Sequence, residues 1–317
     1  MAKTEDFPRV AVVGAGAVGC YFGAMLARAG VPVRLIGRTS HVEAIRNEGL
    51  HLDGLRVNER ISMAATTSME EGLGDASVIL FCVKSGSTES AALEMRPFLI
   101  PGSTILSFQN GVDNPDRIHY AIRIYPIPTA VYVAAEMTAH NRVTHTGRGD
   151  LVIGHHSGWP QVPQLAPLAA LFEQAGIPCK VSERIEADLW AKMVMNCAYN
   201  ALSALTRSQY GRMVRSEPVR AFGVQVIQET VAVARAEGVL LDEKAMIEAA
   251  FLLAEKMTLA TSSMAQDLAR NRPTEIDSLN GYVVRRGEAL GVATPASELL
   301  VAMLKLLEYS ILQRASS

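Results

Sequence analysis

Three polar side chains recur at a fixed spacing in an otherwise apolar part of the chain. Lys192, Asn196 and Asn200 follow one another at steps of four within an apolar stretch from residue 187 to 205. On a helix this spacing places them on one face, and the apolar surroundings predict that the helix is buried. Asparagine is a poor helix former that gains nothing in an exposed helix interior, so a merely solvated face does not explain the pattern. A lysine ammonium in such a stripe could stabilise negative charge and donate a proton.

A glycine-rich turn near the start of the chain is the second candidate site. It comprises Gly14, Ala15, Gly16, Ala17, Val18 and Gly19. In this G-x-G-x-x-G pattern the first glycine permits a tight turn, the second lets a pyrophosphate approach the backbone, and the third allows close helix packing. The pattern also occurs in turns that bind nothing. Here an apolar run at 10–13 precedes it, and a helix to residue 30 and a strand at 33–36 follow, which favours a dinucleotide site at the helix N-terminus.

The end of the second strand indicates which dinucleotide this would be. An NAD site normally carries an acidic residue about 20 residues after the glycine turn, where it binds the ribose 2′-hydroxyl. This chain has Arg38 there, followed by Thr39 and Ser40. A planar cation and two hydroxyls suit a 2′-phosphate, so the sequence favours NADP, although a solvated loop arginine would look the same.

Polar residues also follow two further predicted strands. Lys84 comes directly after the strand at 77–83, and Asn110 follows the strand at 104–108. Ligands collect at the carboxyl ends of parallel strands, so both side chains are candidates for cofactor contact, and Asn110 for substrate contact as well. A lysine at a strand end is ordinarily exposed, and Asn-Gly is also a common turn dipeptide.

The order of elements predicts two domains. Strands at 130–135 and 151–154 and a helix at 165–175 complete an α/β part, and after a strand at 179–181 the pattern becomes helical only. We therefore predict an α/β Rossmann-type nucleotide-binding domain at 1–183 and an all-α C-terminal domain at 184–317, which would hold the substrate. Further helices are expected at 217–237, 243–257, 274–290 and 295–312.

Composition restricts the class of protein. The 317 residues include 49% hydrophobic and 20% charged residues with a net charge of −2, which predicts a soluble globular protein without a field for nucleic acid or an acidic membrane. The polar start, residues 1–8, and the lack of a long apolar run favour the cytoplasm. The four cysteines have no paired spacing and lie in apolar segments, so we expect structural thiols rather than disulfides or metal ligands. The oligomeric state stays open, with a homodimer as one option.

The residues resemble a known family over nearly the whole chain. GAGAVG, VKS, SFQNGVDN, LWAKMVMNCAYNALSAL, SSMAQDL, RPTEIDSLNGYVVRRG and GVATP occur in the order and spacing of ketopantoate reductase (2-dehydropantoate 2-reductase). The motifs beyond the glycine turn are far more specific than that turn. The resemblance implies reduction of a 2-keto acid by NADPH, with 2-dehydropantoate as the substrate, in pantothenate biosynthesis.

The resemblance also implies roles for single residues. NADPH would contact the glycine turn, Lys84, Asn110, Ala134 and Glu275. Lys192 resembles the family's proton-donating lysine, Asn196 and Asn200 its substrate-binding amides, and Ser263 its carboxylate-binding hydroxyl. Glu275 resembles a residue that touches substrate and cofactor, although an acidic residue early in a helix is also favoured by the helix dipole. One position departs from the family, because Tyr210 stands where a further substrate asparagine is expected, which leaves the substrate less certain than the reaction.

Two other interpretations remain open at the level of sequence. One is a hydroxyacid dehydrogenase of the β-hydroxyisobutyrate type, which also pairs a nucleotide-binding domain with a helical domain carrying Lys and Asn one turn apart. The segments SFQNGV and SSMAQDL argue against it. The other is a sensor that binds NADPH without catalysis, and the presence of Lys192 and Glu275 disfavours it.

Overall fold

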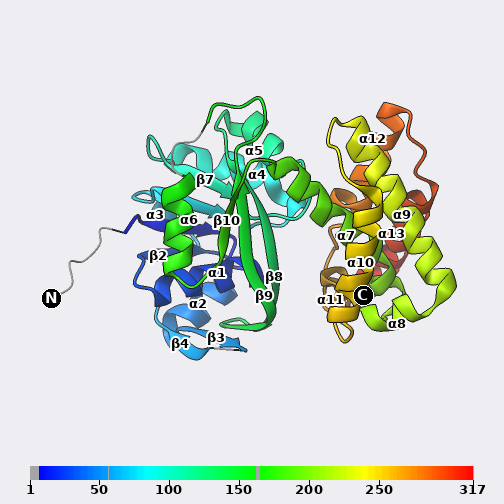
Figure 1. Ribbon diagram of the computed structural model, residues 1–317. Helices are drawn as coiled ribbons and strands as arrows, with labels where there is room; N and C mark the ends of the chain where they lie inside the picture. Colours follow the sequence, from blue (N-terminus) through cyan, green and yellow to red (C-terminus); the bar gives the residue numbers. More distant parts are fainter. Residues whose placement is uncertain (1–6, 56, 162–164, 317) are drawn as a thin grey trace. The chain divides into compact units, whose positions relative to one another are not determined.

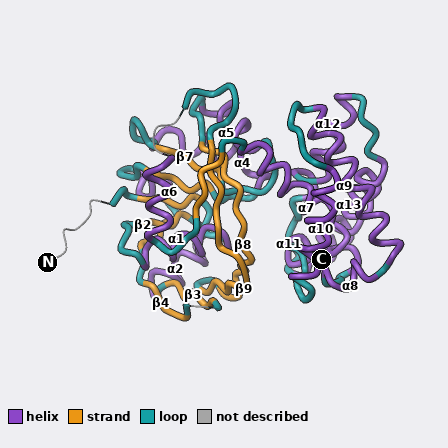
Figure 2. Tube along the Cα trace, in the orientation of Figure 1, coloured by secondary structure: helices purple, strands orange, loops and turns teal. Residues whose placement is uncertain are grey.

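The chain folds into two compact units. The computed structural model describes residues 7–55, 57–161 and 165–316, so most of the polar start of the chain, residues 1–6, lies outside the described residues. The first unit comprises Met1–Gln109 and Asp113–Ile185, and the second comprises Asn110–Val112 and Glu186–Ser317 (Figure 1). Every strand of the described chain belongs to the first unit, whereas the second is built from helices and loops (Figure 2).

The first unit is built on a mixed sheet of ten strands within the described residues. The strands are β1 (Val10–Val13), β2 (Val33–Ile36), β3 (Leu50–Gly54), β4 (Asn58–Ile61), β5 (Ala64–Thr66), β6 (Val78–Phe81), β7 (Thr104–Ser107), β8 (Ile127–Ala139), β9 (Arg142–Gly154) and β10 (Cys179–Ser182). Their order is β4-β3-β9-β8-β7-β6-β1-β2-β5, and β10 pairs with β9. The run from β8 to β5 is parallel throughout, as expected for strands joined by crossover helices.

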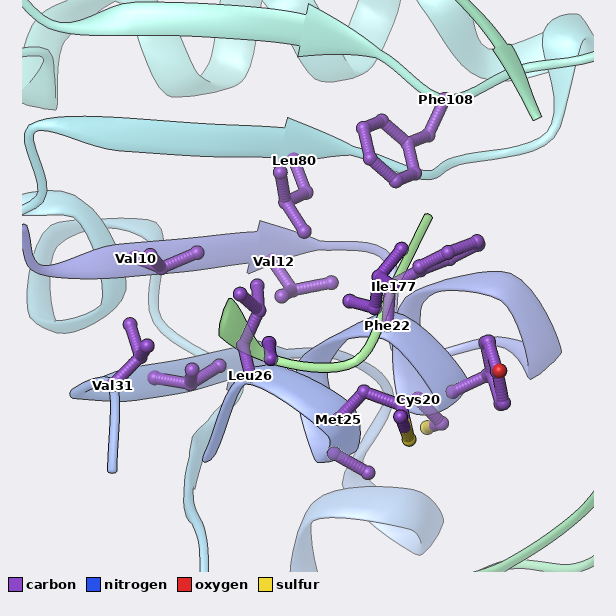
Figure 3. Close-up of a cluster of buried hydrophobic side chains, with 14 of the residues drawn as sticks. Val10, Val12, Cys20, Phe22, Met25, Leu26, Val31, Leu80, Phe108 and Ile177 are labelled. Carbon is purple, nitrogen blue, oxygen red and sulfur yellow. The ribbon is translucent and has the colours of Figure 1, made fainter. Parts of the chain in front are cut away.

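Helices cover both faces of this parallel run. They are α1 (Ala17–Arg28), α2 (Thr39–Glu48), α3 (Met69–Leu73), α4 (Thr88–Met95), α5 (Asn114–Ile122) and α6 (Leu165–Gln174). Alternate residues of each strand point to opposite faces. Val10 and Val12 therefore pack in one core with α1 and α6, where Phe22 and Leu26 are buried (Figure 3). Ala11 and Val13 face a second core that α3, α4 and α5 close.

The predicted strands and the α/β character of this unit are confirmed, with one difference in the later strands. The segments expected at 130–135 and 151–154 form the long antiparallel hairpin of β8 and β9, each of 13 residues. The pairing shifts register after Tyr132, Ala134 and Met137. Such β-bulges twist and bend a hairpin, and the interrupted alternation hides its length from sequence inspection.

The second unit is helical. Its helices are α7 (Ile185–Thr206), α8 (Tyr210–Arg215), α9 (Glu217–Ala236), α10 (Glu243–Lys256), α11 (Ser263–Ala269), α12 (Asn280–Leu290) and α13 (Pro295–Ser316), with a 3-10 turn η3 (Ile276–Ser278) before α12. Helix α7 contributes Trp190, Met193 and Cys197 to one core and Val194 and Ala198 to another. Since α7 is covered on two sides, the predicted burial of this helix is confirmed.

The helix predicted at 274–290 is wrong for its first six residues. Helix α12 begins at Asn280, and the residues before it form the turn η3, which Glu275 precedes. Leu279 has φ −110° and ψ −104°, which interrupts a regular helix just before Asn280. Glu275 is therefore not in the first turn of an α-helix.

The architecture is an α/β Rossmann-type domain followed by an all-α part. Among the described helices, none combines the length and apolarity needed to cross a membrane. All four cysteines are free thiols, and Cys20, Cys179 and Cys197 are buried. Burial raises the pKa of the Cys20 and Cys197 thiols to about 12, which keeps them protonated and unreactive.

Candidate functional site

The glycines of the turn between β1 and α1 differ in what surrounds them. Gly14 has φ +108°, and a Cβ there would lie 2.8 Å from the backbone carbon of Cys82. A Cβ on Gly19 would lie 2.2 Å from the carbonyl oxygen of Gly14. Gly14 and Gly19 are thus required by the fold itself. Gly16 is exposed, and a Cβ there would meet no described atom within 4 Å.

The open position of Gly16 fits a phosphate-binding turn. Gly16 is the N-cap of α1, whose first N–H groups lack partners within the helix and favour an anion. The described residues leave one face of this turn uncovered, while they pack tightly against Gly14 and Gly19. Ala15 is buried, whereas Ala17 and Val18 are half-buried in the first turn. This arrangement is what a pyrophosphate needs to approach the backbone closely.

Arg38 lies beside this turn. A Cβ on the preceding residue, Gly37, would lie 2.6 Å from the Cβ of Ala15, so the end of β2 touches the glycine turn. Arg38 is the N-cap of α2 and is exposed, as are Thr39 and Ser40 after it. The guanidinium and the two hydroxyls are thus accessible to a ligand. Their preference for a 2′-phosphate stays a prediction.

The other predicted cofactor contacts lie on two further strands of the same unit. Lys84 is exposed just beyond β6, whose continuation through Cys82 closes against Gly14. Ala134 lies within β8, opposite Gly147 on β9, and is half-buried. Their contacts with NADPH stay predictions.

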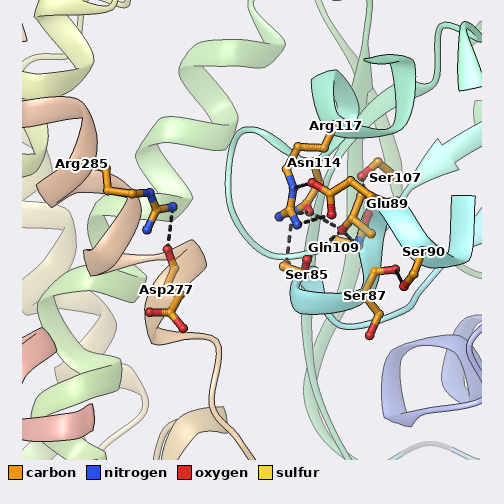
Figure 4. Close-up of polar contacts among 11 residues, drawn as sticks. Ser85, Ser87, Glu89, Ser90, Ser107, Gln109, Asn114, Arg117, Asp277 and Arg285 are labelled. Atoms are coloured by element: carbon orange, nitrogen blue, oxygen red, sulfur yellow. Dashed lines mark hydrogen bonds and ion pairs between the residues drawn. The ribbon is translucent and has the colours of Figure 1, made fainter. Parts of the chain in front are cut away.

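A buried polar network supports the ends of β6 and β7, and sequence reasoning missed it (Figure 4). Gln109 Nε2 donates to Thr88 Oγ1 at 2.7 Å, and Asn114 Nδ2 donates to Ser85 Oγ at 3.1 Å. Thr88 Oγ1 lies 2.8 Å from Asn114 Oδ1, and Ser107 Oγ donates to Gln109 Oε1 at 3.3 Å. All five side chains are buried. Such a network fixes its loops firmly, because each unmade hydrogen bond in it would be costly.

The network extends to an ion pair between two helices. Arg117 of α5 donates two hydrogen bonds of 2.7 Å to Glu89 of α4 and a third to Asn114. The bonds from Arg117 hold the pKa of the Glu89 carboxyl below its usual value. The loops that carry Lys84 and Asn110 both start from this network. The sequence shows a polar residue at the end of each strand, which could have pointed to this network. Which of these residues hydrogen-bond to one another, 20 to 30 positions apart, is visible only in the fold.

Three predicted site residues meet in the second unit. The segment Asn110–Val112 groups with this unit, although it continues from β7. The ammonium of Lys192 donates to Asn110 Oδ1 at 2.8 Å, and Asn110 Nδ2 donates to Glu275 Oε2 at 3.0 Å. One amide therefore connects the predicted proton donor to the predicted acidic residue. All three residues are half-buried.

The Asn110 amide orients both groups. Its oxygen can only accept and its nitrogen can only donate, so it accepts a hydrogen bond from Lys192 and donates one to Glu275. The positive charge of the Lys192 ammonium can stabilise negative charge on a ligand oxygen, and the group can supply a proton.

The two asparagines that continue the stripe on α7 differ in exposure. Asn196 is half-buried one turn from Lys192, whereas Asn200 is buried. The hydroxyl of Tyr210 donates to Asn200 Oδ1 at 3.4 Å, a long hydrogen bond. Tyr210 is itself buried, and burial raises the pKa of its phenol to about 12. The residue that departs from the family pattern therefore contacts a predicted substrate amide.

The two serines at the start of α11 have different surroundings. Ser262 is buried, caps α11 by accepting from Ala265 N, and donates to the carbonyl of Asn200 at 2.9 Å. Ser263 is exposed as the first residue of α11. Ser262 thus fixes the loop against α7, and Ser263 is accessible to a ligand carboxylate. This contact stays a prediction.

Comparisons with known proteins agree over both units. The family model described as "Ketopantoate reductase PanE/ApbA" matches residues 10–158, and "Ketopantoate reductase PanE/ApbA C terminal" matches residues 184–308. The chain is 32% identical to a 2-dehydropantoate 2-reductase of Pyrococcus abyssi, over 94% of this chain and 97% of that protein.

Solved structures with a similar fold cover nearly the whole chain. A PanE/ApbA family ketopantoate reductase from Ralstonia eutropha JMP134 is 47% identical, with a TM-score of 0.89 over 96% of this chain and 99% of that one. A D-mandelate dehydrogenase solved with NADH and anilino(oxo)acetate has a TM-score of 0.88 at 24% identity, over 96% of this chain and 99% of that one, a likeness of fold alone. With two family models over most of its length and a full-length relative above 30% identity, the chain belongs to the ketopantoate reductase family.

Proposed function

We propose that the protein reduces a 2-keto acid to a 2-hydroxy acid with NADPH, and that its substrate is 2-dehydropantoate. The observation that carries the proposal is the contact of Lys192 with Asn110 and of Asn110 with Glu275. The reaction would supply pantoate for pantothenate and coenzyme A biosynthesis in the cytoplasm. Family membership supports an oxidoreductase of this type.

NADPH, when bound, supplies the hydride to the carbonyl carbon. The residues of the chain must hold the carbonyl in line and neutralise the alkoxide that develops on its oxygen. Lys192 provides the positive charge and then the proton. Asn196 and Asn200 hold the polar groups of the substrate, and Ser263 binds its carboxylate.

Glu275 gives selectivity in this proposal. Its carboxylate, oriented by the amide of Asn110, would accept a hydrogen bond from a substrate hydroxyl. A 2-keto acid without this hydroxyl would leave the carboxylate without that partner, which is costly for a half-buried charge. The reaction is thus expected to favour 2-keto acids that bear a hydroxyl group, as 2-dehydropantoate does.

The cofactor preference rests on the surroundings of the glycine turn. Gly16 leaves space for a pyrophosphate, and Arg38 provides an accessible guanidinium at the end of β2. No acidic residue stands at that strand end to bind a ribose 2′-hydroxyl. These features support NADPH over NADH.

A panel of 2-keto acids assayed with NADPH and with NADH tests the proposal. We expect the highest kcat/KM for 2-dehydropantoate with NADPH, and lower values for 2-keto acids of similar size that lack the hydroxyl. NADP reduction with 3-hydroxy acids serves as the comparison reaction, since a β-hydroxyisobutyrate-type dehydrogenase would prefer it. Tight NADPH binding without turnover of any 2-keto acid would contradict the proposal.

A further inference from the structure

Glu275 lies on a segment that is held both by its own short turn and by contacts from other helices. It has φ −99° and ψ 26° and directly precedes the 3-10 turn η3. The backbone carbonyl of Glu275 accepts from the N–H groups of Ser278 and Leu279, so the turn holds the residue on its C-terminal side. On the N-terminal side the position of the backbone depends on what holds Thr274.

The side chain of Glu308, on α13, holds the residue before Glu275. Glu308 Oε1 accepts a hydrogen bond of 2.7 Å from the backbone N–H of Thr274. Glu308 Oε2 lies 3.6 Å from the ammonium of Lys305, one turn earlier on the same helix. Glu308 is only 6% exposed. A buried carboxylate is costly unless it is paired and hydrogen-bonded, and both conditions are met here.

The residues after Glu275 are held from two helices. Lys305 of α13 also donates to the carboxylate of Asp277. From α12, Arg285 donates to the backbone carbonyl of Asp277 at 3.0 Å (Figure 4). The segment that carries Glu275 is therefore fixed at residue 274 by Glu308 and at residue 277 by Lys305 and Arg285. Among these side chains that of Glu308 is buried, whereas those of Lys305 and Asp277 are exposed.

We propose that Glu308 is a positioning residue that acts through Glu275 and thereby sets selectivity for 2-keto acids bearing a hydroxyl group. The inference rests on the proposed function, because Glu275 is the group that would bind this hydroxyl. By holding Thr274 N–H, Glu308 fixes the backbone at the residue before Glu275. A displacement of about 1 Å at a reacting site can reduce the rate roughly 100-fold.

Two variants separate the hydrogen bond from the charge. Glu308→Gln keeps a carbonyl oxygen that can accept from Thr274 N–H, whereas Glu308→Leu removes the acceptor at similar size. We expect Glu308→Leu to lower kcat/KM for 2-dehydropantoate by about tenfold or more, mainly through KM. Glu308→Gln should restore kcat/KM to within about threefold. NADPH affinity should stay within about twofold of the unmodified protein in both.

The decisive measurement is made on the double variants that combine Glu308→Leu or Glu308→Gln with Glu275→Ala. If Glu308 acts through Glu275, adding Glu308→Leu to Glu275→Ala lowers kcat/KM no further. A loss of the same size in both backgrounds overturns the inference. An unimpaired Glu275→Ala variant would instead contradict the proposed function, so the two failures are distinguishable. Glu298→Leu, which changes an exposed glutamate on the same helix, is the matched control and should leave kcat/KM unchanged.

Thermal unfolding of each variant shows whether it is folded. If Glu308→Leu does not fold, Lys305→Met gives the same test. Lys305 is exposed, and its replacement removes the ion pairs with Asp277 and Glu308. We expect a severalfold rise in KM that is absent in the Glu275→Ala background. A rise that persists there overturns the inference.

Discussion

The ammonium of Lys192 on α7 lies 2.8 Å from the side-chain oxygen of Asn110, a residue 82 positions earlier in the sequence. The asparagine follows a strand of the first unit, yet the segment Asn110–Val112 groups with the second unit. The site is thus completed by a three-residue segment that the chain contributes from outside the helical region.

Lys192→Ala tests the proton donor. Loss of a general acid lowers the rate about 100-fold or more, so we expect kcat to fall at least that far while NADPH binding survives. Stopped-flow or steady-state NADPH oxidation with 2-dehydropantoate measures the effect. Lys244→Ala, at an exposed lysine on α10, is the control and should keep normal turnover. Near-normal turnover in Lys192→Ala would refute the assignment.

The two kinds of glycine in the turn predict opposite phenotypes. Gly16→Ala adds a methyl group where the protein leaves space, so stability should be kept while NADPH affinity falls about tenfold, because the methyl group would occupy the path of the pyrophosphate. Gly19→Ala would force a Cβ to 2.2 Å from a backbone oxygen and should unfold the protein or lower its melting temperature strongly. Fluorescence titration with NADPH and thermal unfolding measure the two effects. Unchanged NADPH affinity in Gly16→Ala would argue against the site.

Arg38→Ala tests the preference for NADPH. A hydrogen bond to a charged group contributes about 1.5–3 kcal/mol, so the affinity for NADPH should fall roughly 10- to 100-fold, while the affinity for NADH changes little. Arg60→Ala, at an exposed arginine on β4, is the control. Equal losses for both cofactors would count against a contact between Arg38 and the 2′-phosphate.

Gly223→Ala should stabilise the helical unit. Gly223 lies within α9, where a Cβ would meet no described atom within 4 Å, and glycine in a helix costs about 0.5–1 kcal/mol relative to alanine. We expect the free energy of unfolding to rise by about that amount in urea titrations. Gly211→Ala is the opposite case, because its Cβ would lie 2.8 Å from the Cβ of Thr258, and it should destabilise. A destabilised Gly223→Ala would contradict the observed packing.

Stability should fall in alkaline solution because of the buried thiols. Burial raises the pKa of Cys20 and Cys197 to about 12 from 9.0, so above pH 9 the unfolded chain loses protons that the folded chain keeps. The stabilisation is complete below pH 9 and declines as the pH rises from 9 towards 12, by about 1 kcal/mol per thiol at pH 10. Urea midpoints at pH 7.5, 9 and 10 measure the trend. The Cys20→Ala/Cys197→Ala double variant should show a smaller decline, and an equal decline would contradict this explanation.

The sequence was sufficient for features that depend on local periodicity. The strand at 10–13, the glycine turn and helix α7 were all predicted, because each has a repeating apolar pattern bounded by glycine or polar residues. The polar stripe of Lys192 and Asn196 could likewise be found from spacing alone. These signals reflect nearby residues in the chain, which are the ones a sequence presents together.

Features that depend on distant residues could not be predicted in this way. The backbone around Glu275 is irregular and contacts α13, whereas the sequence alone favoured a continuous helix from residue 274. The Thr88 and Gln109 network joins residues 21 positions apart through fully buried hydrogen bonds. The contact of Tyr210 with Asn200 likewise depends on where α8 packs. Tertiary packing outweighs local preference at each of these places.

Helix α7 packs against separate cores on two sides, and this limits how the site can adapt. A helix packed against two close-packed cores cannot rotate or shift along its axis without creating cavities in both. A longer or bulkier keto acid would therefore have to be accommodated by the four-carbon arm of Lys192 and by the segments around residues 110 and 275. Directed evolution towards new substrates should accordingly concentrate changes in those segments and leave the α7 backbone in place.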